Sequence, residues 1–230
     1  MIDLYTWPTA NGYKVHIMLE ECGLPYAVHA VDISAGDQFS SKFLSVSPNN
    51  KIPAIIDHEG PDGRSISLFE SGAILIYLAG KTGRFLPKSD RERFKMLEWL
   101  MWQMGGFGPM LGQAHHFRHY APDKIEYAQT RYTNESMRLY RVLNTQLEKT
   151  RAFVSGRQYT IADMAIFPWC RLHEKHGVDL EAYPAVKRWF DAVNARPAVK
   201  RALAILADRR QPPDEASRDI LFGARQLQGG

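Results

Sequence analysis

The order of strand-like and helix-like segments in the first 80 residues limits the fold of this 230-residue chain more than any other feature. Four segments rich in β-branched and aromatic residues are expected to be strands: residues 2–7, 26–33, 53–57 and 65–69. Two segments with apolar residues at helical spacing are expected to be helices: residues 11–22, which Gly23 would cap, and residues 71–81. Residues 38–46 read as a short helix or turn.

The connections between these segments define a topology. A strand–helix–strand unit favours parallel pairing of its strands, whereas the turn signal Glu59-Gly60-Pro61-Asp62-Gly63 predicts an antiparallel hairpin. The result is a four-stranded mixed sheet with helices on its faces, in the order βαβ-ββα. This is a thioredoxin-like α/β domain, which we expect to span residues 1–84.

The rest of the chain is helical in pattern. We expect residues 85–90 to be a linker, residues 91–207 to be an all-α helical domain, and residues 208–230 to be a polar C-terminal tail, weakly ordered or lying on the domain as an arm. The cluster Gly105-Gly106-Phe107-Gly108-Pro109 should bend or break the helix before it. Thr160 should cap a helix with Asp163 three residues on, so Asp163 is expected to serve folding rather than catalysis.

The composition excludes several classes of protein. Hydrophobic residues make up 45% and charged residues 23%, as in ordinary globular proteins, which excludes a disordered or fibrous chain. The two cysteines, Cys22 and Cys170, belong to no C-x-x-C pair and are expected to be buried in a protein of a reducing compartment. Without a bilayer-spanning apolar run or a signal-peptide pattern, we expect a cytoplasmic protein with no membrane partner. The net charge is +4, but the sequence has no basic run with interleaved aromatic residues, so no nucleic-acid partner is expected.

The turn between the first strand and the first helix raises a chemical question. It carries Pro8-Thr9-Ala10-Asn11, at the place where a thioredoxin-like domain with its own redox chemistry has a C-x-x-C pair. If this domain handles sulfur, the thiol must come from a ligand.

Five strings in the chain resemble the glutathione transferase family, over roughly residues 1–205: Thr9-Ala10-Asn11-Gly12, Ser47-Pro48-Asn49-Asn50-Lys51-Ile52-Pro53-Ala54, Leu68-Phe69-Glu70-Ser71-Gly72-Ala73-Ile74, Gly105-Gly106-Phe107-Gly108-Pro109-Met110 and Thr160-Ile161-Ala162-Asp163. Their details are similar to the Nu class, the disulfide-reducing type. The resemblance implies glutathione, reduced or as the disulfide, as a bound co-substrate. It also implies a homodimer, with residues 90–104 and 123–148 as its interface.

Glu70 and Ser71 would hold the γ-glutamyl end of glutathione. Ser71 opens a helix directly after a strand, so its hydroxyl and the free backbone N–H groups suit a carboxylate, and Glu70 can pair with an ammonium. The alternative is that Ser71 is only an N-cap and that Glu70 only favours the helix dipole.

Ile52 and Pro53 would hold the cysteinyl part of the ligand. By resemblance, the peptide bond between them is cis and the Ile52 backbone pairs with the cysteinyl backbone. A trans proline that opens an edge strand is the alternative. Lys51 and Gln38 would lie towards the glycyl carboxylate, although Lys51 could instead be an ordinary surface charge.

Thr9 and Asn11 are the expected catalytic residues. They would flank the ligand's sulfur at the start of the first helix, where hydrogen bonds and the helix N-terminus favour a thiolate. Many transferase classes use Tyr, Ser or Cys for this task. For Asn11 a simple capping role is the alternative, and Tyr5 is expected to be packed within its strand.

Two further groups of residues lie in the helical part. By resemblance to the Nu class, Arg131 reaches the charged end of the ligand, and the alternative is one exposed helical arginine among many. His115 and His119 have the i, i+4 spacing of zinc ligands, but the sequence has no H-E-x-x-H pattern and no obvious third ligand, so we expect no metal. We expect instead a wall of the acceptor pocket, formed with Trp102, Met104 and Phe107.

The resemblance implies a glutathione-dependent disulfide-bond reductase, in which two glutathiones and a small disulfide give glutathione disulfide and two thiols. One alternative is a transferase or peroxidase that acts on electrophiles or organic hydroperoxides. A second alternative is a module that binds glutathione without turnover.

Overall fold

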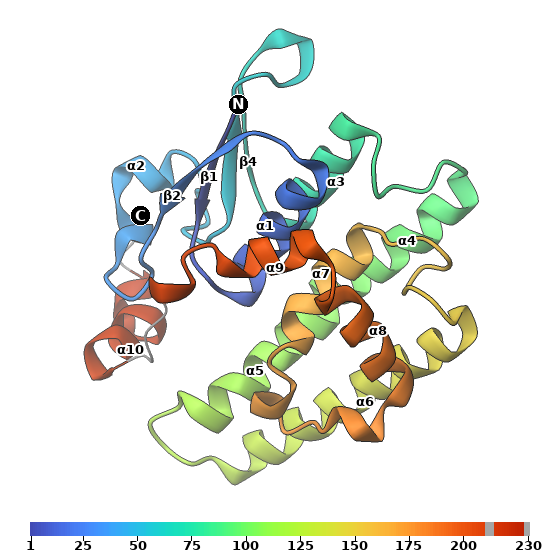
Figure 1. Ribbon diagram of the computed structural model, residues 1–230. Coiled ribbons are helices and arrows are strands. Elements are labelled where there is room, and N and C mark those ends of the chain that lie inside the picture. The colour runs from blue at the N-terminus through green and yellow to red at the C-terminus, as the bar shows by residue number, and fades with distance from the viewer. Residues whose placement is uncertain (210–213, 228–230) are drawn as a thin grey trace. The chain divides into compact units, whose positions relative to one another are not determined.

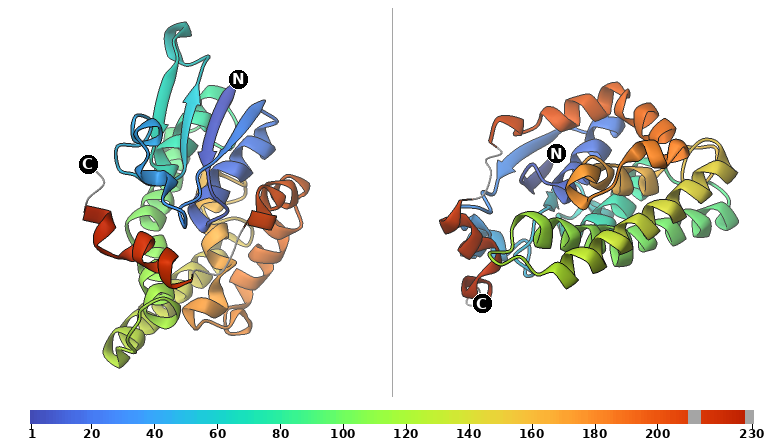
Figure 2. Two further views of the ribbon diagram at one scale, coloured as in Figure 1. Left: turned by 90° about the vertical axis from the view of Figure 1, so that its left-hand side faces the viewer. Right: turned by 90° about the horizontal axis from the view of Figure 1, so that it is seen from below.

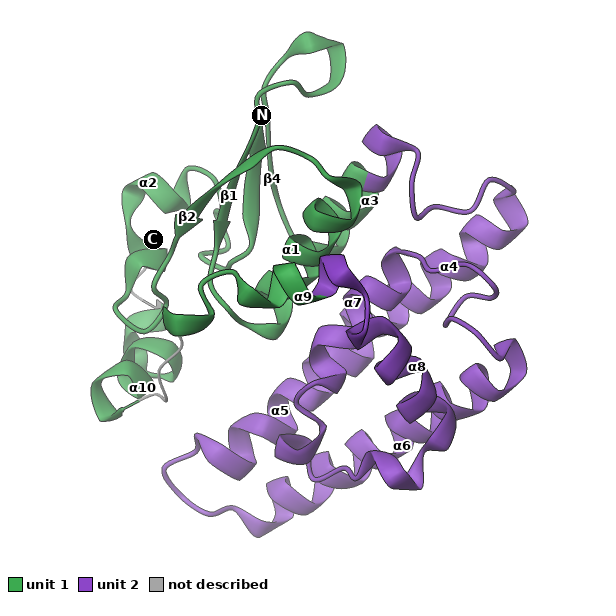
Figure 3. Ribbon diagram, in the orientation of Figure 1, with its two compact units in different colours: residues 1–78, 200–230 green, residues 79–199 purple. Residues whose placement is uncertain are grey.

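The computed structural model describes residues 1–209 and 214–227. The chain forms two compact units (Figure 3). Unit 1 comprises residues 1–78 and 200–230, and unit 2 comprises residues 79–199. The polar segment around residues 210–213 and the terminal residues 228–230 lie outside the described residues.

Unit 1 is built on a four-stranded sheet, as the sequence predicts (Figure 1). Its strands are β1 (Ile2–Thr6), β2 (Tyr26–Ala30), β3 (Ala54–Asp57) and β4 (Ile66–Phe69). In the order β2-β1-β3-β4, β1 is parallel to β2, whereas β3 is antiparallel to both of its neighbours. The mixed sheet confirms the thioredoxin-like arrangement.

The helical segments of unit 1 come from both ends of the chain. The first part contributes α1 (Ala10–Cys22), η1 (Asp37–Phe39), α2 (Ser41–Leu44), η2 (Pro61–Gly63) and most of α3 (Ser71–Thr82). The last part contributes the end of α9 (Pro197–Ala204), then η6 (Ala207–Arg209), α10 (Glu215–Phe222) and η7 (Ala224–Leu227). The views in Figure 2 show the same C-terminal segments, in red, from two further sides.

Each face of the sheet carries buried apolar side chains, since the successive residues Leu4 and Tyr5 of β1 point to opposite faces and are both buried. One cluster of buried residues joins the sheet to α2 and the segment before β3. It consists of Tyr5, Val31, Phe43, Val46 and Ala54, with Ile52 and Ile56 packed against it. The helix α1 ends as predicted, at Gly23 in the left-handed conformation (φ 65°), and its inner residues Val15, Ile17 and Leu19 are fully buried.

His16, on α1, links the sheet to the C-terminal part of unit 1. The side chain is fully buried, with Nε2 2.8 Å from Thr6 Oγ1 and Nδ1 3.4 Å from the carbonyl oxygen of Ala202 on α9. Burial lowers the pKa of His16 to about 4, so the imidazole is neutral at pH 7. A neutral ring with its proton on Nδ1 satisfies both contacts, because the carbonyl accepts and the threonine hydroxyl can donate.

This buried histidine predicts how stability depends on pH. Its pKa in the folded state lies below the ordinary value of 6.5, so the unfolded state binds the extra proton first. The stabilisation that comes from keeping His16 neutral is complete above pH 6.5 and is lost as the pH falls towards 4. Lowering the pH from 6.5 to 5 should therefore reduce the free energy of unfolding by up to about 2 kcal/mol, at about 1.4 kcal/mol per pKa unit.

Urea unfolding of the wild type and of His16→Gln at several pH values measures this. The variant has no titrating ring, so its stability should change less over this range. If the free energy of unfolding changed equally with pH in the two proteins, the low pKa of His16 would be contradicted.

Unit 2 is helical. Its segments are the end of α3, α4 (Asp90–Trp102), η3 (Gln103–Phe107), α5 (Gly108–His119), α6 (Glu126–Thr150), α7 (Ile161–Cys170), η4 (His173–His176), η5 (Leu180–Ala182), α8 (Pro184–Asn194) and the start of α9. None of the helices in the described ranges has the length and apolar character that crossing a membrane requires.

The glycine cluster of unit 2 changes the helix rather than ending it. Residues Gln103–Phe107 form a wider π-helical turn between α4 and α5. Gly108 follows this turn, and a Cβ there would overlap the side-chain amide of Gln103. The expectation of a break is therefore corrected, because the small residues allow the chain to stay helical while a buried glutamine packs against it. The expected bend stays a prediction.

Asp163 has the structural role that its spacing predicts. It is fully buried and forms a capping box with Thr160, whose N–H donates to Oδ2 at 2.9 Å. Oδ1 accepts from the N–H of Val154 and from Trp189 Nε1, both at 2.9 Å. The carboxylate thus joins α7 to the preceding loop and to α8.

Candidate functional site

Three segments with predicted site residues leave the sheet of unit 1 at the same edge. Ala54, the first residue of β3, pairs with Tyr5 near the end of β1 and with Phe69 at the end of β4. The chain that follows β1, the chain that precedes β3 and the chain that follows β4 therefore meet there (Figure 1). This edge brings together the turns of three pairs of residues: Thr9 and Asn11, Ile52 and Pro53, and Glu70 and Ser71.

The first turn is shaped by close packing at the start of α1. Thr9 is the N-cap of the helix, and its Oγ1 accepts from the N–H of Gly12 at 3.2 Å. A Cβ at residue 12 would overlap the carbonyl oxygen of Trp7, so only glycine fits. Asn11 lies on the first helical turn and is half-buried. The positive end of α1 and the polar side chains of Thr9 and Asn11 can stabilise an anion here.

The second turn offers backbone groups. The peptide bond between Ile52 and Pro53 is cis, as the resemblance implies. Among the described residues, the N–H and C=O of Ile52 have no hydrogen-bond partner, although the side chain packs against the buried cluster. Next to it, Ser47 Oγ donates to the carbonyl oxygen of Lys51 at 2.8 Å and fixes the turn. An extended ligand could therefore pair with the Ile52 backbone.

The third turn opens α3. Glu70 is exposed and adopts a positive φ of 69°, a conformation that non-glycine residues rarely adopt. Ser71 begins the helix and is only 4% exposed. A carboxylate ligand would find the helix N-terminus and the Ser71 hydroxyl here.

Sequence reasoning missed Lys14, on α1, which faces this third turn. It is 1% exposed, and its Nζ donates to Ser71 Oγ at 3.4 Å. Burial lowers the pKa of Lys14 to about 7, while the charge of Glu70 opposes this shift. The signal that could have found it is a lysine inside the buried stretch from Tyr13 to Leu19. The lysine places a buried amine, which is protonated below about pH 7, beside the predicted carboxylate position.

Gln38 and Lys51 lie in the segment that connects β2 to β3. Gln38 is buried on η1, where its Nε2 donates to the carbonyl oxygen of Ile33 at 3.1 Å. Its Oε1 has no hydrogen-bond partner among the described residues. Nε2 carries a second N–H, which is the donor that a carboxylate ligand needs. Lys51 is exposed, and its Nζ donates to Gln226 Oε1 at 3.0 Å.

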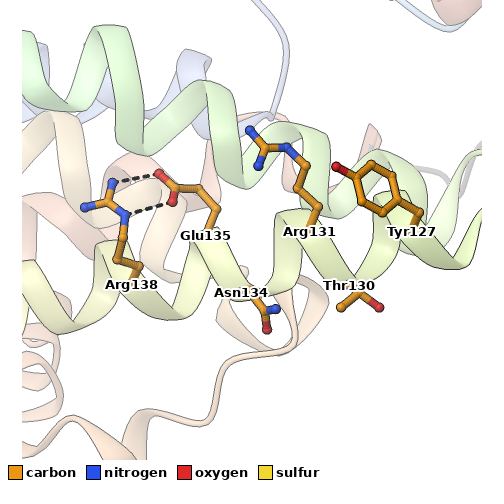
Figure 4. Close-up of a pocket in the computed structure, with 6 residues that line it drawn as sticks. All are labelled: Tyr127, Thr130, Arg131, Asn134, Glu135 and Arg138. Atoms are coloured by element: carbon orange, nitrogen blue, oxygen red, sulfur yellow. Dashed lines mark hydrogen bonds and ion pairs between the residues drawn. The ribbon is translucent and has the colours of Figure 1, made fainter.

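Arg131 belongs to unit 2, on α6. Figure 4 shows its guanidinium between Tyr127 and the pair formed by Glu135 and Arg138, whose two hydrogen bonds measure 2.8 and 2.7 Å. These side chains line a surface hollow together with Thr130 and Asn134. Arg131 is exposed and makes no hydrogen bond or ion pair with any described residue. Its role towards a ligand stays a prediction.

Three residues that the sequence analysis placed outside the site are Tyr5, Cys22 and Cys170, and two of them are packed as expected. Tyr5 is 9% exposed and stacks on His29, with ring centroids 4.8 Å apart. Cys170 is buried, and burial raises the pKa of its thiol. Cys22 is only half-buried, which corrects its prediction: it is the last residue of α1, about 18 Å along the helix from the residues at its start.

The remaining pocket and metal predictions concern unit 2. Phe107 is fully buried between Trp102 and Tyr140, so it belongs to the core and does not line an open pocket. His119 Nε2 lies 3.0 Å from the carbonyl oxygen of Lys175. The rings of His115 and His119 lie edge to face, with their centroids 5.3 Å apart. Residues 1–209 and 214–227 contain no group of three His, Cys, Asp or Glu side chains that could hold a metal ion.

Comparison with known proteins identifies the family. The family model of the glutathione S-transferase N-terminal domain matches residues 1–80, and that of the glutathione S-transferase C-terminal domain matches residues 107–197. The chain belongs to the glutathione S-transferase family. Among similar curated proteins, "Disulfide-bond oxidoreductase YfcG" of Escherichia coli (strain K12) is 53% identical over 213 residues, which cover 91% of this chain and 99% of YfcG.

Solved structures of the glutathione S-transferase family are similar over most of both chains. A family member from Pseudomonas fluorescens, solved with two glutathione bound, has a TM-score of 0.83 and 48% identity, and the match covers 88% of this chain and 92% of that one. A glutathione transferase from Pseudomonas putida, solved with one glutathione disulfide bound per subunit, has a TM-score of 0.84 and 45% identity, with 89% and 91% covered. The fold of this chain is therefore the glutathione transferase fold.

Proposed function

We propose that this protein is a glutathione-dependent disulfide-bond reductase. The observation that carries the proposal is the sheet edge where the start of α1, the unpaired Ile52 backbone and the Ser71–Lys14 pair meet, without a cysteine in any of these turns. Glutathione fits this set of groups, because it brings its own thiol and carries charges at both ends. The similarity to a protein named as a disulfide-bond oxidoreductase and to a structure with glutathione disulfide supports the choice of reaction.

Each part of the ligand has its own residues in this proposal. Ser71, with Lys14 behind it, receives the γ-glutamyl carboxylate, and Glu70 receives the ammonium. The backbone of Ile52, before Pro53, pairs with the cysteinyl part. Lys51 and Gln38 receive the glycyl carboxylate. Arg131 serves the charged end of the ligand, by resemblance to the Nu class.

The reaction proceeds by two thiol–disulfide exchanges. The thiolate of one glutathione, stabilised by Thr9, Asn11 and the N-terminus of α1, attacks one sulfur of the small disulfide, and the other sulfur leaves as a thiol. The thiolate of a second glutathione attacks the glutathione sulfur of the mixed disulfide. The products are glutathione disulfide and a second thiol, so atoms and electrons balance without a metal.

Further properties belong to the same proposal. The similarity to a protein named as a disulfide-bond oxidoreductase supports a place in the Nu class, the disulfide-reducing type that the sequence motifs resemble. We propose residues 1–84 as the glutathione-binding domain, 85–90 as the linker, 91–207 as the helical domain and 208–230 as the tail. Cys22 and Cys170 are thiols in this structure and form no disulfide within the described residues, which supports a cytoplasmic location, where thiols stay reduced.

Turnover assays test the reaction. We expect glutathione-dependent reduction of a small dialkyl disulfide to exceed turnover with a nitroaryl halide or an organic hydroperoxide. Ser71→Ala should raise the KM for glutathione about tenfold with a smaller change in kcat, because it removes a ligand contact present before and during reaction. Ser45→Ala, an exposed control, should behave as the wild type. Disulfide reduction no faster than the uncatalysed background would overturn the proposal.

The role of Lys14 predicts a pH dependence of ligand binding. The pKa of Lys14 is about 7 in the free protein, and a bound carboxylate would raise it. Affinity should therefore fall as the pH rises above 7, since binding must then take up a proton. Lys14→Met should bind S-methylglutathione at least about tenfold more weakly at pH 6.5 and should lack this pH step.

Calorimetric titration with S-methylglutathione measures both quantities, because its sulfur cannot titrate. An unfolding midpoint of the variant close to that of the wild type serves as the control for folding. An unchanged affinity and pH slope in Lys14→Met would remove this lysine from the site.

We also propose a homodimer with residues 90–104 and 123–148 at its interface. Support comes from large exposed apolar side chains on α4 and α6, such as Phe94 (69% exposed) and Tyr127 (77% exposed). Sedimentation equilibrium should give the dimer mass for the wild type and for Lys200→Ala, an exposed control outside both ranges, and a shift to monomer for Phe94→Asp. A wild type that is monomeric at micromolar concentrations would contradict the proposed homodimer.

A further inference from the structure

The C-terminal segment Asp214–Leu227 has no residue among those that the proposed function assigns to the ligand. The family models end at residue 197, so it lies beyond both of them. It forms α10, capped by Asp214, whose Oδ1 accepts from the N–H of Ser217 at 2.8 Å, and then η7. It belongs to unit 1, together with the sheet. Figure 2 shows this red segment beside the light-blue turns near α2.

Gln226 connects this segment to Lys51. Its Nε2 donates to the carbonyl oxygen of Ile220 at 2.6 Å, and this contact orients the amide. Its Oε1 therefore faces Lys51 and accepts from Nζ at 3.0 Å. An ammonium has three donors, so two of them stay available to a ligand while Gln226 fixes the position of the third.

Arg225 connects the segment to the turn that carries Gln38. Its guanidinium lies over the ring of Phe39, 5.5 Å from the centroid. It also lies against Gly36, where an added Cβ would stand 3.2 Å from Nη2. Within the described ranges the guanidinium makes no hydrogen bond or ion pair, so its N–H groups can serve a ligand.

One of these contacts is made with Lys51 and the other with the neighbours of Gln38, and the proposed function assigns Lys51 and Gln38 to one end of glutathione. Gln226 holds Lys51, and Arg225 lies beside η1, which carries Gln38, whose Nε2 has a second N–H besides the one donated to Ile33. Partial desolvation by the surrounding protein lowers the pKa of Lys51, although the residue is exposed. A carboxylate at this place would meet two cations, one of them held in position.

We propose that the C-terminal segment completes the recognition site for the glycyl carboxylate of glutathione, with Gln226 as a positioning residue for Lys51 and Arg225 as a second cation for the carboxylate. This inference rests on the proposed function and deepens it. It gives the segment a role in specificity: the site should prefer a peptide with a free C-terminal carboxylate over one in which this group is blocked.

The test compares glutathione with its glycyl monoethyl ester, which has the same thiol and the same γ-glutamyl end. For each protein, kcat/KM in disulfide reduction and the dissociation constant from calorimetry are measured with both ligands. We expect the wild type to prefer glutathione over the ester. Arg225→Ala and Gln226→Ala should each reduce this preference at least about fivefold, in the range that the loss of one hydrogen bond to a charged group produces.

Two further variants make the result specific. Arg218→Ala removes the same charge from an exposed position on α10 and should keep the wild-type preference. Gln226→Glu is close in shape but places a carboxylate on Lys51, so it should weaken binding of glutathione more than binding of the ester. A purely structural role of the segment would instead weaken both ligands equally.

The outcomes separate the two proposals. An unchanged preference in Arg225→Ala and Gln226→Ala, or a tighter binding of glutathione by these variants, would overturn the inference, the latter because the segment would then compete with the ligand. A wild type that binds glutathione and prefers it to the ester, but does not reduce disulfides, would overturn only the reaction. A wild type that binds neither ligand would overturn the proposed function itself.

Discussion

The antiparallel pairing of β3 with a strand on each side is the interaction on which the arrangement of the candidate site depends. Ala54 has partners in both neighbouring strands, Tyr5 and Phe69, so three connections are fixed at one sheet edge by ladder hydrogen bonds. A slip of one residue would move the Ile52–Pro53 turn by about 3.3 Å and turn the buried face of β3 outward. The buried cluster around Phe43 and Val46 opposes such a slip, because it holds Ile52 and Ala54 on one face.

The sequence was sufficient for the features that depend on neighbouring residues. Caps and turns carried the fold: Gly23 ends α1, Thr160 opens α7, and the turn before β4 closes the hairpin. Bounds were less accurate where a tertiary contact decides them. The second strand ends at Ala30 instead of residue 33, since Val31 turns into the buried cluster while its N–H still donates to the carbonyl oxygen of Thr6 at 3.0 Å.

The features that sequence reasoning missed depend on distant residues. Lys14 meets Ser71 across 57 positions, and Lys51 meets Gln226 across 175 positions. Neither pair leaves a periodic signal, because each is made by one long polar side chain. The glycine cluster shows the same limit, since composition indicated a helix breaker and only the packing of Gln103 explains why a π-helical turn forms instead. The residue roles towards glutathione depend on the resemblance, and the geometry of the turns supplies their physical reasons.

The contact of His16 with Ala202 has a consequence for the separability of the two family domains. The buried side chain of His16, on the helix α1 that begins at the candidate site, has its hydrogen-bond acceptor in the carbonyl of Ala202, 186 residues further along the chain. A gene fragment that stops near residue 80 would leave that imidazole without its acceptor and would uncover the surface on which the returning chain packs. Chimaeras that exchange the N-terminal domain between relatives should therefore carry the matching residues beyond 200 as part of the same module.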